Sequence, residues 1–164
     1  MQFKWTLVLA TIWVVLATPV FAAETIVSSF TKVDGAPPNF DLNYYEKDCE
    51  EECQIANFVC KPDHDVEVTL TDIGAKWVVK AINAVDHEFK IVLAGKSYPF
   101  LIRQIDYAGE LTNDWHVRGE SHGDNTPLFK ELEKAKSIIV NIKGFKIVLP
   151  VTKEAKEWAV ACQK

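Results

Sequence analysis

The chain has 164 residues, which is enough for one domain, or for a leader and one domain, and too few for two well-packed domains. Hydrophobic residues make up 48% of it and charged residues 25%, which is typical of a globular protein and excludes a disordered or collagen-like chain. The formal charge is −5, from 18 basic and 23 acidic residues, and the basic residues are scattered along the sequence. This distribution argues against a nucleic-acid binder or an anionic-membrane binder, because either would carry a clustered basic footprint.

Residues 1–23 have the pattern of an export signal. Lys4 is their only charged residue, and Pro19 precedes Val20 and Ala22, which are small enough for positions −3 and −1 of a signal-peptidase site. A retained anchor is the alternative, because the uncharged stretch approaches the roughly 20 residues that span a bilayer. The proline near its end and the lack of a basic cluster after it favour cleavage. We therefore expect a cleaved signal peptide over residues 1–23, no later membrane span, and a periplasmic or secreted location.

Four cysteines remain after cleavage: Cys49, Cys53, Cys60 and Cys162. An even number in an exported chain favours two disulfides over free thiols. A zinc site is less well supported, because the first three cysteines have no second knuckle to complete it. Three connectivities are open, and we favour Cys60–Cys162 with Cys49–Cys53. A bond to Cys162 would close a loop of about 100 residues, worth about 4 to 5 kcal/mol in the chain-entropy model.

Apolar residues alternate with polar ones over residues 54–60 and again over 66–70, on either side of a turn, which is typical of a β-hairpin with one apolar face. A second strong hairpin is predicted around Gly144. Strands are expected over residues 26–30, 54–60, 66–70, 89–93, 98–105, 115–117, 137–142 and 146–151.

Helices are predicted where apolar residues recur at 3.6-residue spacing behind a start signal. Asp72, the Thr126-Pro127 pair and Thr152 supply these signals for helices over residues 73–85, 126–135 and 153–162. In the last helix Cys162 shares the apolar face and should point into the core. The expected fold is one α+β domain over residues 24–164, an antiparallel sheet of hairpins with about three helices packed on it and disulfides tying it.

The densest polar patch runs from Trp115 to Asn125. His116, Glu120 and His122, with Asp124 nearby, have the right atoms for a metal site but no recognised ligand spacing. The alternative is a polar strand end that leads into a glycine-rich loop before the next helix, and we favour it. A serine triad within this segment is rejected, because triad partners converge from separate elements.

Other charged groups are weaker candidates. His64 and His87 each lie between two acids, an arrangement that favours the imidazolium form but that is more often a solvated turn. An acidic cluster surrounds two of the cysteines and could face a cationic partner, although a calcium loop is excluded by the absence of its glycine and ligand pattern. The acidic cluster consists of Glu46, Asp48, Glu50, Glu51 and Glu52.

The C-terminal segment resembles the invasion-associated-locus-B-like family of small exported proteobacterial proteins. The features that match are residues 128–135, the strand over 137–142, Gly144-Phe145, and the closing helix with Cys162. The resemblance covers about 40 residues and departs from the family at the Cys49-to-Cys60 cluster. It implies a periplasmic or surface-associated protein and transfers no functional residue.

The sequence therefore favours an exported, non-enzymatic binding protein, host-interacting or inhibitor-like, without a cofactor. Its partner would be a protein or a polysaccharide and not a nucleic acid. Two alternatives are open. One is a metal-dependent hydrolase centred on His116, Glu120 and His122, and the other is a subunit of an envelope assembly that offers an edge strand to its neighbour.

Overall fold

The computed structural model describes residues 26–35, 39–48, 53–71, 87–107 and 115–164. These ranges hold nine strands and two helices. The helices are α2 (Thr126–Leu132) and α3 (Lys153–Ala161). The strands are β1 (Ile26–Val33), β2 (Asn39–Glu46), β3 (Gln54–Cys60), β4 (Val66–Leu70), β5 (Glu88–Leu93), β6 (Lys96–Tyr107), β7 (Trp115–Ser121), β8 (Ser137–Ile142) and β9 (Phe145–Pro150).

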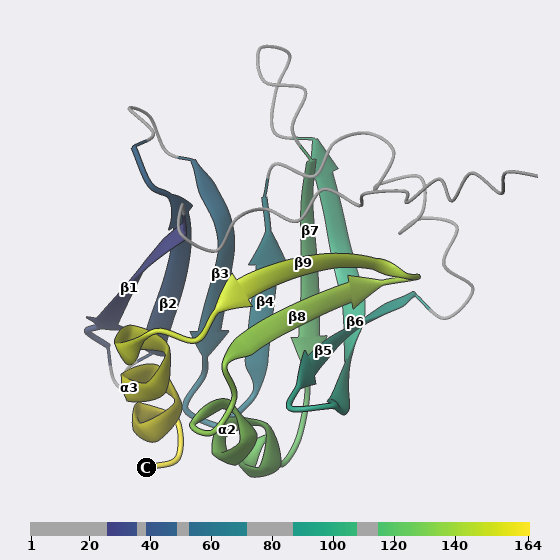
Figure 1. Ribbon diagram of the computed structural model, residues 1–164. Helices are drawn as coiled ribbons and strands as arrows, with labels where there is room; N and C mark the ends of the chain where they lie inside the picture. Colours follow the sequence, from purple (N-terminus) through teal and green to yellow (C-terminus); the bar gives the residue numbers. More distant parts are fainter. Residues whose placement is uncertain (1–25, 36–38, 49–52, 72–86, 108–114) are drawn as a thin grey trace, which may run out of the picture.

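All nine strands belong to one sheet, in the order β1-β2-β3-β4-β7-β6-β5-β8-β9, and every neighbouring pair is antiparallel. The sheet curves until it is nearly closed and barrel-like (Figure 1). Two neighbour pairs, β4 with β7 and β5 with β8, are distant in sequence. The antiparallel α+β prediction is therefore confirmed, and the hairpins at residues 54–70 and 137–150 are as expected.

The helix prediction needs correction. The described residues contain two helices instead of about three, and the helix predicted over residues 73–85 lies outside them. Helix α3 packs on β1 and β2, and α2 packs on α3 and reaches β5, so the helices gather at one end of the sheet (Figure 1). A nearly closed sheet encloses most of its own apolar face. The helices therefore cover the opening of the sheet and do not form a layer across a flat face.

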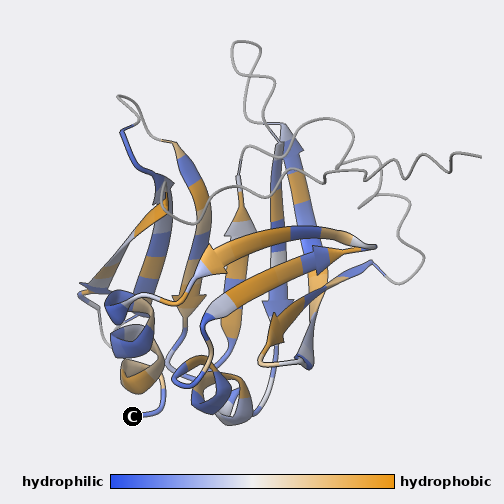
Figure 2. Cartoon of the chain, viewed as in Figure 1, coloured by the Kyte–Doolittle hydropathy of each residue, from blue (hydrophilic) through white to orange (hydrophobic). Residues whose placement is uncertain are grey.

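The core lies inside the curved sheet. Buried side chains alternate with half-buried ones along β3 and β4. The colours of Figure 2 show hydrophobic and hydrophilic residues in turn along the strands. Trp158 of α3 is fully buried and makes edge-on ring contacts with Phe58 and Phe129 at centroid distances of 6.1 and 5.5 Å. Its indole Nε1 donates a hydrogen bond of 2.8 Å to the Phe40 carbonyl oxygen. Burial of a side chain this large on the interior face of α3 stabilises the fold by several kcal/mol.

Polar contacts fix the start of α3 against β1 and β2. Thr152 is the N-cap residue, as predicted, and its hydroxyl accepts from the Ala155 amide at 3.2 Å. The same hydroxyl lies 2.6 Å from the Ser28 hydroxyl on β1. The phenol of Tyr44 on β2 donates to the Pro150 carbonyl at 2.9 Å. These contacts join the two ends of the sheet through the strand-to-helix connection.

Among the described residues, no helix combines the length and the apolar character that crossing a bilayer requires.

Gly119 on β7 lies where the sheet has no room for a side chain. A Cβ atom at this position would overlap the ring of Phe89, which stacks on Phe100 with the ring centroids 5.5 Å apart. We expect Gly119→Ala to lower the free energy of unfolding by about 2 kcal/mol through overpacking. Urea denaturation measures this loss. The double variant with Phe89→Leu makes space for the methyl group, and its loss should be smaller than the sum of the two single losses; additive losses would contradict the steric explanation.

Candidate functional site: a charged network on the outer face

Strand register places two carboxylates side by side on the outside of the sheet, and three cations lie around them. Glu67 on β4 pairs with Glu120 on β7, which pairs in turn with Leu101 on β6, so these residues form one row across three strands. Val66 and Val68 beside Glu67, Gly119 beside Glu120 and Phe100 beside Leu101 are buried, and therefore this row faces outward. Like charges directly opposite each other are destabilising unless cations offset them.

The cations come from both flanks of this row. Lys61 Nζ lies 3.2 Å from a carboxylate oxygen of Glu67 and 3.2 Å from one of Glu120. Arg118 Nε lies 3.2 Å from Glu67, and Arg103 Nε lies 3.2 Å from Glu120. The register of β6 against β7 shifts between Ile102 and Gln104, and Arg103 is the extra residue at this bulge.

His122 extends the network to the turn before β4. Its Nδ1 lies 2.6 Å from an Asp65 carboxylate oxygen, to which it donates. Its Nε2 lies 3.0 Å from Arg103 Nη2 and 3.3 Å from Glu120 Oε2, so it accepts from the guanidinium when neutral and donates to the carboxylate when protonated. The Gly123 amide also donates to Asp65, at 3.0 Å. We name the set Lys61, Asp65, Glu67, Arg103, Arg118, Glu120 and His122 the outer charged network.

The cations of the outer charged network lie above its anions. The Arg103 and Arg118 side chains are 47% and 44% exposed, whereas those of Glu67 and Glu120 are 17% and 20% exposed. An approaching molecule therefore meets guanidinium groups that are oriented by carboxylates beneath them. This arrangement preorganises donors on an open surface, which is suited to recognition of acceptor groups.

The environment shifts the pKa of two carboxyl groups in the outer charged network and of one beside it. The hydrogen bond from His122 is the main cause that lowers the pKa of Asp65, and the Gly123 amide adds to it. Partial burial works against ionisation of Glu120, but the hydrogen bond and charge of Lys61, with His122 and Arg103, hold its pKa below the usual range. Burial raises the pKa of Asp41 on β2, and the charge of Glu67 raises it further. The network therefore favours ionised Asp65 and Glu120.

The structure divides the residues of the predicted metal site. Glu120 and His122 are in contact, but His116 pairs with Asp106, six residues and about 20 Å of extended chain from His122. Asp124 accepts a 2.9 Å hydrogen bond from the Thr126 amide at the start of α2. Among the described residues, no group of three or more His, Cys, Asp and Glu side chains is placed to hold a metal ion. The metal interpretation of His116, Glu120 and His122 therefore lacks its geometry.

The segment after β7 has a structural role instead. Asn125 is buried, and its amide nitrogen donates to the carbonyls of His64 and Ser121 at 2.9 and 3.1 Å. The Ser121 hydroxyl donates to the Asn125 side-chain oxygen at 2.9 Å, and so it is engaged away from His122. His64 Nδ1 donates to the Cys162 carbonyl at 2.7 Å. This chain of bonds connects the β3–β4 turn, the end of β7 and the end of α3.

Two of the four cysteines meet where the end of β3 lies beside the end of α3. Cys60 and Cys162 are buried, and their side chains lie 2.7 Å apart, which is close contact but longer than a disulfide bond. Burial, and then the neighbouring Cys60, raise the pKa of the Cys162 thiol. The structure thus brings the predicted partners together without the covalent bond. Cys49 lies outside the described residues, and the predicted Cys49–Cys53 pairing therefore lies outside them as well.

The remaining predicted groups lie apart from the network. Glu46 ends β2, where its amide donates to the Cys53 carbonyl at 3.0 Å, and Asp48 follows in a turn with φ of 70°. Residues 50–52 of the acidic cluster lie outside the described residues. His87 is an exposed turn residue with φ of 45° before β5.

Comparison of the chain with known protein families, with curated proteins and with solved structures finds no match.

The pKa shifts predict opposite pH dependences for two carboxyl groups. Asp65 has a lowered pKa, so its ionised form stabilises the folded state above about pH 4, and that contribution is lost as the pH falls through the lowered value. Asp65→Asn should therefore cost about 1 kcal/mol at pH 7 and less at pH 3. Denaturant unfolding at both pH values measures the difference.

Asp41 provides the matched control, because its pKa is raised and the sign reverses. Its ionisation opposes folding above the raised pKa, so Asp41→Asn should be more stable than the natural chain at pH 7 and no more stable at pH 3. If both variants changed stability in the same direction at pH 7, the electrostatic explanation would be wrong.

Proposed function

We propose that the protein is an exported, non-enzymatic binding protein that acts in the periplasm or outside the cell and recognises its partner through the outer charged network. The observation that carries this proposal is the layering of exposed Arg103 and Arg118 over the less exposed carboxylates of Glu67 and Glu120. Each guanidinium is held by a carboxylate before any partner arrives, which lowers the side-chain entropy cost of binding.

The same layering favours binding over catalysis. His122 has a partner at each ring nitrogen within the network, and the nearby Ser121 hydroxyl is directed to Asn125. A hydrolytic site needs an activated nucleophile within reach of a base. The groups of the outer charged network instead satisfy one another on an open face.

Export is supported by the leader-like residues 1–23 and by the cysteines. Cys60 and Cys162 are separated by more than 100 positions, yet the fold brings their buried side chains to 2.7 Å. In an oxidising compartment an oxidised thiol partner would take up two electrons and two protons as the two thiols form one disulfide. We propose that Cys60–Cys162 is bonded in the mature protein and ties the end of α3 to β3. The family resemblance of the C-terminal segment agrees with this location.

Assembly through an edge strand is a second candidate, and one observation favours it. Within the part of the chain that the structure describes, β1 pairs with β2 alone and no strand pairs with its other edge, and Val27 and Val33 on it are 43% and 41% exposed. A partner strand could add to such an edge. Lys32 on the same strand acts against unspecific pairing.

The binding proposal predicts a loss of capture for one surface only. Arg103→Ala/Arg118→Ala should reduce capture of the specific partner from envelope and host extracts by tenfold or more, as measured by quantitative mass spectrometry. Lys32→Ala/Lys47→Ala removes the same charge from exposed positions elsewhere and should retain capture. Equal capture by both double variants would show that the outer charged network is not the binding surface.

The disulfide proposal predicts a melting temperature that depends on redox conditions. Cys162→Ala should lower Tm by about 10 °C under oxidising conditions and change it little in reductant, because the loop constraint is lost only where the bond exists. Cys60→Ala and the double variant should behave like Cys162→Ala, since all three lose the same bond. Equal Tm losses in both conditions would contradict the bond.

A further inference from the structure

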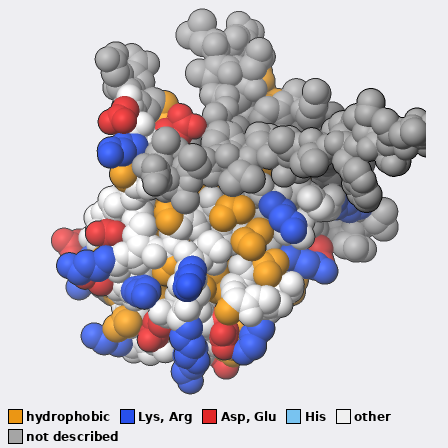
Figure 3. Space-filling view, viewed as in Figure 1, with side chains coloured by type: hydrophobic (Ala, Val, Ile, Leu, Met, Phe, Trp, Pro, Cys, Tyr) orange, Lys and Arg blue, Asp and Glu red, His pale blue; other side chains and the backbone are white. Residues whose placement is uncertain are grey.

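The lysines that look scattered along the sequence are concentrated in its last part. Residues 126–164 contain eight lysines and four glutamates, with no arginine and no aspartate, and so they carry +4 in a chain whose total is −5. These residues form α2, α3 and the β8–β9 hairpin. Basic side chains, with acidic ones among them, lie on the viewed face over the two helices (Figure 3). The last part of the chain therefore carries an excess of positive charge that the net charge of the whole sequence hides.

The glutamates of this region are already engaged. Glu131 pairs with Lys96 at 2.6 Å, and Glu157 pairs with Lys153 at 3.4 Å. Glu133 accepts from Gln163 at 2.6 Å, and Glu154 accepts from Ser28 at 3.3 Å. In contrast, six exposed lysines of residues 126–164 make no ion pair with the described residues: Lys130, Lys134, Lys136, Lys146, Lys156 and Lys164.

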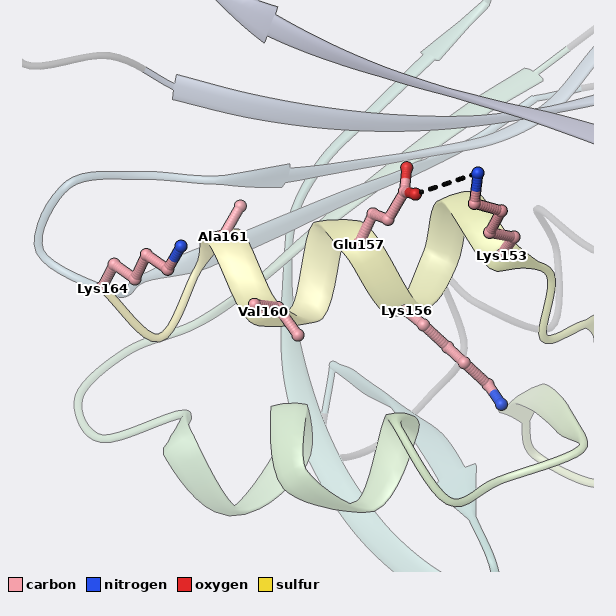
Figure 4. A pocket seen from close by; sticks show the side chains of 6 residues that line it. All are labelled: Lys153, Lys156, Glu157, Val160, Ala161 and Lys164. Atoms are coloured by element: carbon pink, nitrogen blue, oxygen red, sulfur yellow. Dashed lines mark ion pairs between the residues drawn. The ribbon is translucent and has the colours of Figure 1, made fainter.

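A shallow hollow on α3 lies among these charges. It measures about 320 Å³ and is lined by Lys153, Lys156 and Lys164 together with Glu157, Val160 and Ala161. Figure 4 shows the Lys156 and Val160 side chains directed to the side of α3 where α2 lies. Val160 is 43% exposed, so its side chain provides a small apolar surface that lies between the lysine ammonium groups of the hollow.

We propose that the helix layer of α2 and α3 binds an anionic polysaccharide, with Lys153, Lys156 and Lys164 contacting its carboxylate or sulfate groups. The proposal rests on the binding role above and names the partner class and a second surface for it. Ammonium groups are compact point charges that bind successive anionic groups without fixed geometry, as a repeating polymer requires. The sugar rings provide the apolar contact for Val160.

The composition of the layer favours a polysaccharide over two other polyanions. Nucleic-acid surfaces use arginine and exposed aromatic rings for phosphates and bases, and residues 126–164 have no arginine, while Val160 is the one exposed large hydrophobic residue on the described helices. A helix that lies in a bilayer surface presents a row of large apolar side chains to the lipid. Here the helix faces that carry such residues, including Trp158 and Phe129, are buried in the core.

Titration calorimetry of the mature full chain with heparin and with polygalacturonate, at 25 and 250 mM NaCl, tests the proposal. We expect binding at low salt, with Kd rising at least tenfold at high salt, because exposed charges are screened. Lys153→Gln/Lys156→Gln/Lys164→Gln should raise Kd for both probes by tenfold or more. The control Lys32→Gln/Lys47→Gln/Lys90→Gln removes the same charge elsewhere and should change Kd less than twofold.

Two outcomes would overturn the proposal. One is no binding of either polysaccharide at 25 mM NaCl by a chain with an unchanged Tm. The other is an equal effect of the two triple variants, which would make net charge and not this surface responsible. Vesicles with anionic headgroups serve as a third probe, and binding to them alone would assign the surface to a membrane instead. The capture experiment with Arg103 and Arg118 variants is independent, so failure here leaves the outer charged network untouched.

Discussion

Burial of Trp158 at the open end of the curved sheet is the interaction on which the rest of the structure depends. The edge strands of the sheet are β1 and β9. Helix α3 follows β9 in the sequence and packs against β1 in space. The indole Nε1 donates a hydrogen bond to the Phe40 carbonyl oxygen, so a large ring is buried without an unpaired donor. Its position orders the Thr152 cap and brings Cys162 to Cys60. Without this ring the core would lack the group that packs β3 against α2 and α3.

Local patterns in the sequence were sufficient for most of the elements. The β3–β4 and β8–β9 hairpins follow from alternation, and the core face of α3 follows from its 3.6-residue spacing. β2 was missed, although Phe40, Leu42 and Tyr44 alternate, because Gly35 to Asn39 and the acidic residues after Tyr45 dominate the composition of that region. Tyr44 is a core residue that contacts the Phe58 ring, and Phe40 packs against the core. This neighbourhood is not visible locally.

The candidate site was predicted less well than the fold, for a physical reason. Glu120 and His122 were selected as neighbours in sequence, and they do touch. Their other partners arrive through strand pairing: Glu67 and Asp65 from β4 and its turn, and Arg103 from a bulge on β6. The sequence order of β4, β5, β6 and β7 does not reveal that β4 lies next to β7. His116 failed as a partner because a strand carries it away from His122, whereas a helix would have brought them closer.

The position of α3 in the chain has a consequence for how the molecule forms. Every strand precedes it, so the opening of the barrel stays unplugged until residues 153–161 are available, and the non-local β4–β7 and β5–β8 pairings must wait for segments made later. A chain with this order of elements completes its tertiary structure only after α3 has been made, because non-local contacts close only when both of their segments are present.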